Sequence, residues 1–137
     1  MKFLLKCQLL SISGSIYVIS CMEPFGVITQ PGTTILSANY PDSYENGLHC
    51  QVTITLKDSV LIDFEDFEVE DWNDCAADWL EVRDGDTFNS TMIGSKLCGS
   101  DIPQPMKSTG KSLTLVFISD GTGVGKGFSI RTSNSDA

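Results

Sequence analysis

The chain has 137 residues, of which 41% are hydrophobic, and a formal net charge of −9 at neutral pH. This length and composition predict one folded domain that buries its own core. The acidic balance argues against nucleic acid, polyanionic sugars and anionic lipid surfaces as partners, because each of these binds a basic face. A cation or a basic protein is the natural complement.

The first residues have the layout of a secretory signal peptide. Basic residues come first, an apolar stretch follows over 9–19, and Val18 and Ser20 stand three and one positions before Cys21. We therefore predict a signal peptide over residues 1–20 and a secreted, extracellular product. No membrane insertion is expected after cleavage, since the stretch is too short and polar for a span of about 20 residues. An uncleaved anchor and a mis-assigned first exon are the alternatives.

The number of cysteines agrees with secretion into an oxidising environment. Removal of residues 1–20 takes Cys7 away and leaves an even number of cysteines, which is typical of disulfide-bonded secreted proteins. The remaining cysteines are Cys21, Cys50, Cys75 and Cys98. Four cysteines allow three pairings, and their spacing does not choose among them. Zinc is the competing use, but the gaps are too wide for paired Cys ligands and the chain has one histidine, His49, which we expect to be partly buried.

Short alternating stretches separated by turn residues fill the rest of the chain. Segment 26–50 is rich in Gly, Pro, Asn and Ser, which predicts short strands and turns. Clear strands follow over 51–56 and 60–69, and the alternation of the second slips by one residue at Glu65-Asp66, which indicates a β-bulge. Further strands are expected over 79–83, 113–117 and 128–130, the first ending in an Asp84-Gly85 turn. The pattern predicts an all-β protein, a two-sheet antiparallel β-sandwich.

Segment 63–85 is dense in carboxylates around one cysteine. Most of these carboxylates are explained as the solvated face of two half-buried strands. Glu70 and Asp78, which flank Cys75, are set apart as candidate cation ligands. Trp79 fits a core position, whereas Trp72 lies in a loop where an exposed aromatic would serve as a binding anchor.

Several short motifs follow one another in a characteristic order. They comprise Cys21, Asn39-Tyr40-Pro41, Tyr44, Cys50, the frame Phe64-x-x-Phe67-x-x-Glu70, Cys75, Asp78, Leu80, Val82, Asp84-Gly85, Cys98-Gly99, Phe117-Ile118-Ser119-Asp120 and Gly127-Phe128. This ordered set resembles a single CUB domain over residues 21–132, with 133–137 left as a short polar tail. Val52 and Ala77 stand where the family usually carries aromatic residues. The resemblance implies a jelly-roll-like sandwich with the disulfides Cys21–Cys50 and Cys75–Cys98.

The resemblance also implies a calcium site, since a large subset of CUB domains binds Ca²⁺ through one tyrosine and three acidic residues. Carried over by position, the metal ligands are Glu70, Asp78, Asp120 and the backbone carbonyl of Thr122, with Tyr44 as a donor that holds a carboxylate in place. The alternative is that Asp120-Gly121 is only a hairpin turn and the other two carboxylates are solvated strand ends.

A non-enzymatic extracellular binding module is the function that the resemblance implies. In similar calcium-binding CUB domains a basic side chain of the partner contacts the acidic metal ligands. We therefore expect calcium-dependent recognition of an extracellular protein that presents Lys or Arg. The alternatives are a spermadhesin-like protein that binds carbohydrate or gamete coats, and a fragment of a multi-domain CUB protease or endocytic receptor.

Two further expectations concern chemistry on the chain itself. Asn89-Ser90-Thr91 is a glycosylation sequon in a polar stretch, and we expect Asn89 to carry a glycan in a secreted chain. Catalysis is not expected, because a single histidine beside a cysteine offers no triad and the sequence contains no P-loop.

Overall fold

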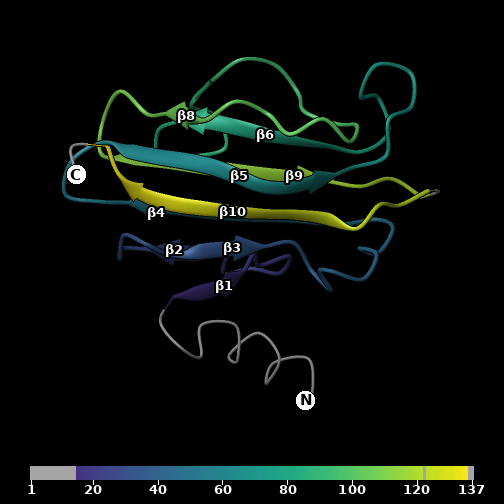
Figure 1. Cartoon of the computed structure of the whole chain (residues 1–137), viewed down its shortest axis with the longest axis horizontal. Helices are drawn as coiled ribbons and strands as arrows, with labels where there is room; N and C mark the ends of the chain where they lie inside the picture. The colour runs from purple at the N-terminus through teal and green to yellow at the C-terminus, as the bar shows by residue number, and fades with distance from the viewer. Residues whose placement is uncertain (1–14, 122, 136–137) are drawn as a thin grey trace.

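The computed structural model describes residues 15–121 and 123–135, which form a sandwich of two β-sheets (Figure 1). In chain order the strands are β1 (Ile16–Val18), β2 (Gly26–Ile28), β3 (Thr34–Leu36), β4 (His49–Thr55), β5 (Val60–Glu68), β6 (Trp79–Asp84), β7 (Thr91–Met92), β8 (Met106–Lys107), β9 (Ser112–Ile118) and β10 (Gly127–Asn134). Five strands in the order β1-β3-β10-β5-β8 make one sheet, and β2-β4-β9-β6-β7 make the other. The predicted all-β sandwich is confirmed.

The pairing is antiparallel except at one side of the sandwich. There, the edge strands β1 and β2 run parallel to their neighbours β3 and β4. Figure 1 shows these early strands stacked at that side of the molecule. Within the two described ranges there is no helix, and so none long and apolar enough to span a membrane.

The core consists of the inward-facing residues of the long central strands. In β4 the buried residues Cys50, Val52 and Ile54 alternate with partly exposed ones, as the sequence predicted. Phe117 of β9 and Phe128 of β10 meet edge to face at 5.4 Å between ring centroids, which joins the two sheets in the middle of the sandwich. Each such side chain stabilises the fold by about 1.5–3 kcal/mol through burial.

Strand β5 contains the bulge that its sequence indicated. Phe64 pairs with Ile130 and Asp66 with Ser129, so Glu65 is the extra residue. Before Glu65 the even-numbered residues face the core, and after it Phe67 and Val69 do. The bulge therefore keeps an apolar face towards the core on both sides of the slip.

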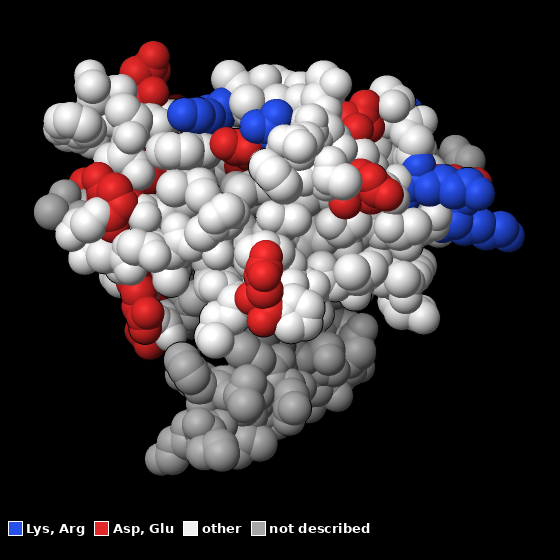
Figure 2. Space-filling model, turned by 180° about the vertical axis from the view of Figure 1, so that it is seen from behind, with Lys and Arg blue, Asp and Glu red and all other residues white. Residues whose placement is uncertain are grey.

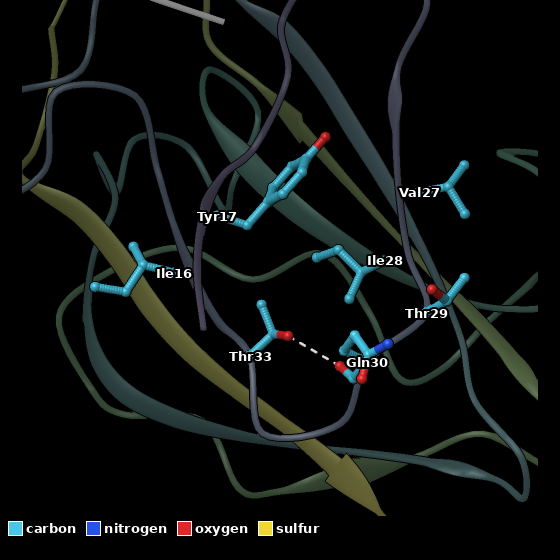
Figure 3. A pocket seen from close by; sticks show the side chains of 7 residues that line it. All are labelled: Ile16, Tyr17, Val27, Ile28, Thr29, Gln30 and Thr33. Carbon is cyan, nitrogen blue, oxygen red and sulfur yellow. Dashed lines mark hydrogen bonds between the residues drawn. The ribbon is translucent and has the colours of Figure 1, made fainter. Parts of the chain in front are cut away.

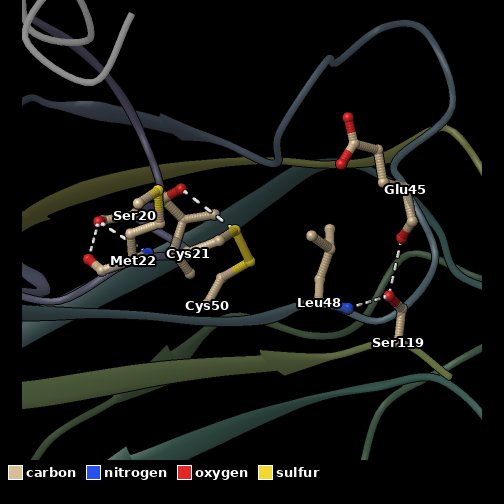
Figure 4. The surroundings of a disulfide bond; sticks show 8 residues. Ser20, Cys21, Met22, Glu45, Leu48, Cys50 and Ser119 are labelled. Atoms are coloured by element: carbon tan, nitrogen blue, oxygen red, sulfur yellow. Dashed lines mark hydrogen bonds between the residues drawn. A yellow bond between two sulfur atoms is a disulfide. The ribbon is translucent and has the colours of Figure 1, made fainter. Parts of the chain in front are cut away.

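Both disulfides that the resemblance implies are present. Cys21–Cys50 connects the start of the domain to β4, and Cys75–Cys98 connects the loop after β5 to the segment before β8. They close loops of 29 and 23 residues, and each contributes on the order of 3 kcal/mol in the chain-entropy account. Figure 4 shows the Cys21–Cys50 disulfide, with Ser20 and Met22 next to Cys21.

The expectation of a partly buried His49 is wrong. Cys50 points into the core, so the preceding side chain must point to the opposite face of β4. His49 is exposed there and stacks on Phe25 at 5.8 Å between ring centroids.

The structure describes only the last part of the predicted signal peptide, which covers residues 1–20. Residues 1–14 lie outside the described residues. Residues 16–18 form β1, and Ile19 is buried against the core with 1% of its surface exposed. The last residues before Cys21 are thus packed on the sandwich.

Candidate metal centre

Three carboxylates from separate parts of the chain meet at one end of the sandwich. Asp78 directly precedes β6 and Asp120 follows β9, and these strands are antiparallel neighbours with Trp79 opposite Ile118. Glu70 follows β5 of the other sheet. One oxygen from each of the three side chains lies within 4.8 Å of the other two. The pairing of β6 with β9 therefore closes a gap of more than forty residues in sequence.

Asp78 is the fixed member of the cluster. Its surface is fully buried, its Oδ2 accepts a hydrogen bond from the Tyr44 hydroxyl at 2.6 Å, and its Oδ1 accepts one from the backbone N–H of Asp120 at 2.9 Å. Burial raises the pKa of the Asp78 carboxyl above its ordinary value, although both hydrogen bonds oppose the shift. These two bonds hold Asp78 in one orientation and bring Asp120 up to it.

Tyr44 connects two of the three acidic segments through one hydroxyl group. The hydroxyl donates to Asp78 and accepts the backbone N–H of Glu70 at 3.0 Å. The side chain is buried, with 1% exposed, and its ring meets Phe117 edge to face at 4.9 Å. Burial and the carboxylate acceptor raise the pKa of the phenol, so Tyr44 stays protonated and acts as a donor. It thus lies beside the cluster and holds a carboxylate, the role that the resemblance implies.

Glu70 carries the strongest indication that the cluster binds a cation. Its Oε1 is buried and has no hydrogen-bond partner among the described residues. Burial raises the pKa of the Glu70 carboxyl, and the charges of Asp78 and Asp120 raise it further. Leaving such an acceptor unsatisfied is unfavourable, and a bound cation would supply the missing partner.

A glycine loop closes over Glu70. Gly123 has a φ of 79°, in the left-handed region, and a side chain there would overlap the Glu70 carboxylate. Glycine is thus required both for the turn and for the close approach. Thr122, whose backbone carbonyl was expected to be a metal ligand, lies outside the described residues, and that assignment stays a prediction.

The donor set fits calcium. The three side chains offer only carboxylate oxygens, and the cluster contains no histidine or cysteine. Oxygen-only sites suit hard cations such as Ca²⁺, which takes six to eight oxygen ligands at about 2.3–2.6 Å, whereas Zn²⁺ prefers nitrogen and sulfur. The residues present therefore fit the ion that the sequence suggested.

Ser119 supports the site and was not identified from the sequence. Its hydroxyl accepts the backbone N–H of Leu48 at 2.9 Å and donates to the carbonyl of Glu45 at 2.8 Å (Figure 4). Next to it, the backbone N–H of Gly47 donates to the carbonyl of Asp120 at 2.7 Å. These bonds fasten the loop after Tyr44 to the end of β9. The signal that could have found Ser119 is its fixed place before Asp120 in the Phe-x-Ser-Asp motif.

The other carboxylates of segment 63–85 do not join the cluster. Glu81 is held by Arg83 at 2.7 Å and by the indole N–H of Trp79 at 2.8 Å. Asp66 accepts the Tyr40 hydroxyl and pairs with Lys126 at 3.0 Å, and the Tyr40 bond is the main cause of its lowered pKa. Figure 2 shows Asp and Glu side chains at several separate places on one face of the molecule. Some of the strand-face acids are thus paired rather than simply solvated.

Two exposed apolar side chains flank the cluster in sequence. Trp72, with 59% of its surface exposed, comes two residues after Glu70, and Val124, with 40% exposed, directly follows Gly123.

Asn89, the predicted glycosylation site, lies in the exposed turn between β6 and β7, where a glycan would meet solvent. Its glycosylation stays a prediction.

A family model for the CUB domain matches residues 21–132. Human tolloid-like protein 1 is 43% identical over 99 residues, which cover 71% of this chain and 10% of that protein. Rat cubilin is 38% identical over 110 residues, covering 79% of this chain and 3% of that protein. The chain thus spans about a tenth or less of these relatives.

Solved structures share the two-sheet arrangement. The CUB2 domain of MASP-1 bound to Ca²⁺ superimposes with a TM-score of 0.69 at 29% identity, covering 79% of this chain and 96% of that one. The extracellular region of zebrafish Gpr126/Adgrg6 gives a TM-score of 0.70 at 29% identity, covering 83% of this chain and 14% of that one.

Proposed function

The chain belongs to the CUB domain family, whose members are extracellular, non-catalytic binding modules, and from this premise we propose that it binds a protein partner in a calcium-dependent manner. The proposal includes secretion by the predicted leader. The observation that carries it is the buried, unpartnered Oε1 of Glu70 within a cluster of three carboxylates. A relative of known structure, the MASP-1 CUB2 domain, is bound to Ca²⁺ and supports the choice of ion.

Glu70, Asp78 and Asp120 would hold the ion, and Tyr44 would orient Asp78. Bound calcium supplies a partner for the Glu70 oxygen and offsets the mutual repulsion of the carboxylates. Extracellular calcium modules have dissociation constants of about 10⁻⁴ to 10⁻³ M, which match the calcium concentration outside cells. The site would therefore be filled after secretion.

The partner is expected to present Lys or Arg. Three carboxylates and one Ca²⁺ leave about one net negative charge, and Asp120 is the most exposed of the three acids. A basic side chain arriving at Asp120 would meet this charge, held rigid by the ion. Trp72 beside the cluster supplies an exposed aromatic surface that can pack on the stem of a long basic side chain.

The test uses the secreted full chain. Calcium binding is measured by calorimetry, and binding to immobilised poly-L-lysine is measured with calcium, with magnesium and with chelator, using acetylated poly-L-lysine as the control surface. We expect binding that needs both calcium and free amines. Asp120→Asn should abolish it, whereas Asp101→Asn, the same change at an exposed acid outside the cluster, should not. Equal binding by the two variants would refute the proposed role of the site.

The alternative that this domain works within a longer protein is favoured by one observation. In human tolloid-like protein 1 the matched region is 10% of the protein, and in rat cubilin it is 3%. In that setting the same acidic cluster would be the binding site, and the calcium test above applies unchanged.

A further inference from the structure

Residues 15–20 are built into the sandwich by backbone pairing. Strand β1 runs parallel to β3, with Tyr17 opposite Ile35. The N–H of Ile19 donates to the carbonyl of Leu36 at 2.9 Å, and one residue later the carbonyl of Ser20 accepts the N–H of Gln51 at 2.8 Å. Leu36 belongs to one sheet and Gln51 to the other. The segment therefore crosses from one sheet to the other and links them at the open side of the sandwich.

The side chains of this segment are as firmly integrated as its backbone. Ile19 is 1% exposed and packs with the core cluster, immediately before the disulfide-bonded Cys21. Ser20 is 8% exposed, and its hydroxyl donates to the carbonyl of Met22 at 2.8 Å. A cut before Cys21 would remove a core side chain and would expose the backbone edge of β3, the kind of open edge that promotes aggregation.

Gly26 leaves the space that the Tyr17 side chain occupies. A Cβ atom at Gly26 would overlap the hydroxyl and ring of Tyr17, so the tyrosine lies across the bare backbone at the start of β2. Figure 3 shows the Tyr17 ring projecting from β1 towards the strand that carries Val27 and Ile28, at a cavity of about 220 Å³. Tyr17, which precedes the expected cut before Cys21, thus packs against Gly26, which follows that cut.

We propose that residues 15–20 stay in the mature domain as its first strand, and that the leader is removed upstream of Ser15 rather than before Cys21. The sequence offers Ser11 and Ser13 at three and one positions before Gly14, the small-x-small pattern that signal peptidase accepts. Hydrolysis there adds one water across the peptide bond, leaving a carboxylate on Ser13 and an amine on Gly14. Both cuts remove Cys7 and the two leader lysines, so cysteine parity and charge do not distinguish them.

The position of the cut is tested on the full chain secreted from eukaryotic cells. Intact mass after deglycosylation and N-terminal sequencing should give a first residue after Cys7 and no later than Ser15, with Gly14 expected. A mature protein that begins at Cys21 would overturn the proposal.

The packing is tested separately by a double-mutant cycle on the same purified protein. Gly26→Ala should lower the Tm by several degrees, on the order of 5 °C, because the new methyl group meets Tyr17. Combining it with Tyr17→Ala should remove most of the penalty, so that the two effects are not additive. Gly110→Ala is the matched control, since a Cβ there meets open space. If Gly26→Ala is as harmless as Gly110→Ala, β1 does not occupy its place in the mature protein and the proposal fails.

Discussion

Replacing Glu70 by Gln should raise the stability of the calcium-free protein and reduce the stability that it gains on binding calcium. Without calcium, Glu70 has a buried carboxylate oxygen beside Asp78 and Asp120, and desolvation together with these charges raises the pKa of its carboxyl. Glu70→Gln removes the charge but keeps the shape, so the repulsion is relieved. With calcium, the same change deletes one of the three acidic ligands. The calcium-free form should therefore melt at a higher temperature than wild type, and the calcium-bound form should gain less.

The expected magnitudes follow from mass action. At about 5 mM calcium, a site with a dissociation constant of about 10⁻⁴ to 10⁻³ M stabilises the folded state by about 1–2 kcal/mol, which corresponds to roughly 4–10 °C in Tm for a domain of this size. Losing one carboxylate ligand should weaken the site about ten-fold or more, since affinity depends on the number of ligand charges. The calcium-dependent gain in Tm of Glu70→Gln should then fall to less than half that of wild type.

The measurement is a thermal melt of the wild type, Glu70→Gln and Glu23→Gln, each in chelator and in calcium at neutral pH. Glu23 is an exposed glutamate outside the cluster, and its variant should follow the wild type in both conditions. Two results would refute the reasoning. One is a Glu70→Gln protein that melts below wild type in chelator, and the other is one that keeps the full calcium-dependent gain.

Three other changes probe the site and its surroundings. Tyr44→Phe removes the donor to Asp78 and the acceptor for the Glu70 N–H, so urea unfolding should show a loss of about 1–3 kcal/mol in chelator, and calorimetry a calcium affinity about ten-fold lower or more. The calcium-dependent gain in Tm should shrink as the pH is lowered from about 7.5 to about 5, because Glu70 and Asp78 have pKa values raised above their ordinary values and bind protons in competition with the ion. A carboxyl with a raised pKa binds protons more readily in the folded than in the unfolded state, so these two groups should make the calcium-free protein more stable over the same fall in pH. A calcium effect that grows on acidification would contradict the expected competition between protons and the ion. Asn89→Gln should lower the mass of the secreted protein by one glycan and leave its calcium response unchanged, as mass spectrometry and melting curves would show.

The sequence predicted the central strands well because alternation is a local property. In β4 and β5 each inward residue is apolar, and even the slip at Glu65 is visible as a change of phase. Short strands were expected within segment 26–50, but neither β1 nor the parallel pairing of β1 and β2 was predicted. Each of them has three residues, too few for a periodic pattern, and β1 falls inside the stretch that resembled a leader.

The site could be predicted only in part, because it depends on pairing between distant strands. The three acidic positions came from the family resemblance, whereas their meeting depends on β6 lying next to β9, which places Asp78 beside Asp120. Nothing local marks Gly123 as the residue that closes over Glu70. The exposure of His49 was predictable, since extending the alternation of Val52 and Ile54 backwards places Cys50 inward and His49 outward.

The extra residue in β5, Glu65, decides to which face of the sheet each of the following side chains points. If Glu65 were paired in regular alternation instead of bulging out, Phe67 and Val69 would turn towards solvent, and the charged side chains of Glu68 and Glu70 would turn towards the core. No ligand would have been altered, yet the first carboxylate of the cation cluster would face the wrong way. The geometry of the metal centre is therefore decided five residues upstream of Glu70, in the middle of a strand, by the position of Glu65.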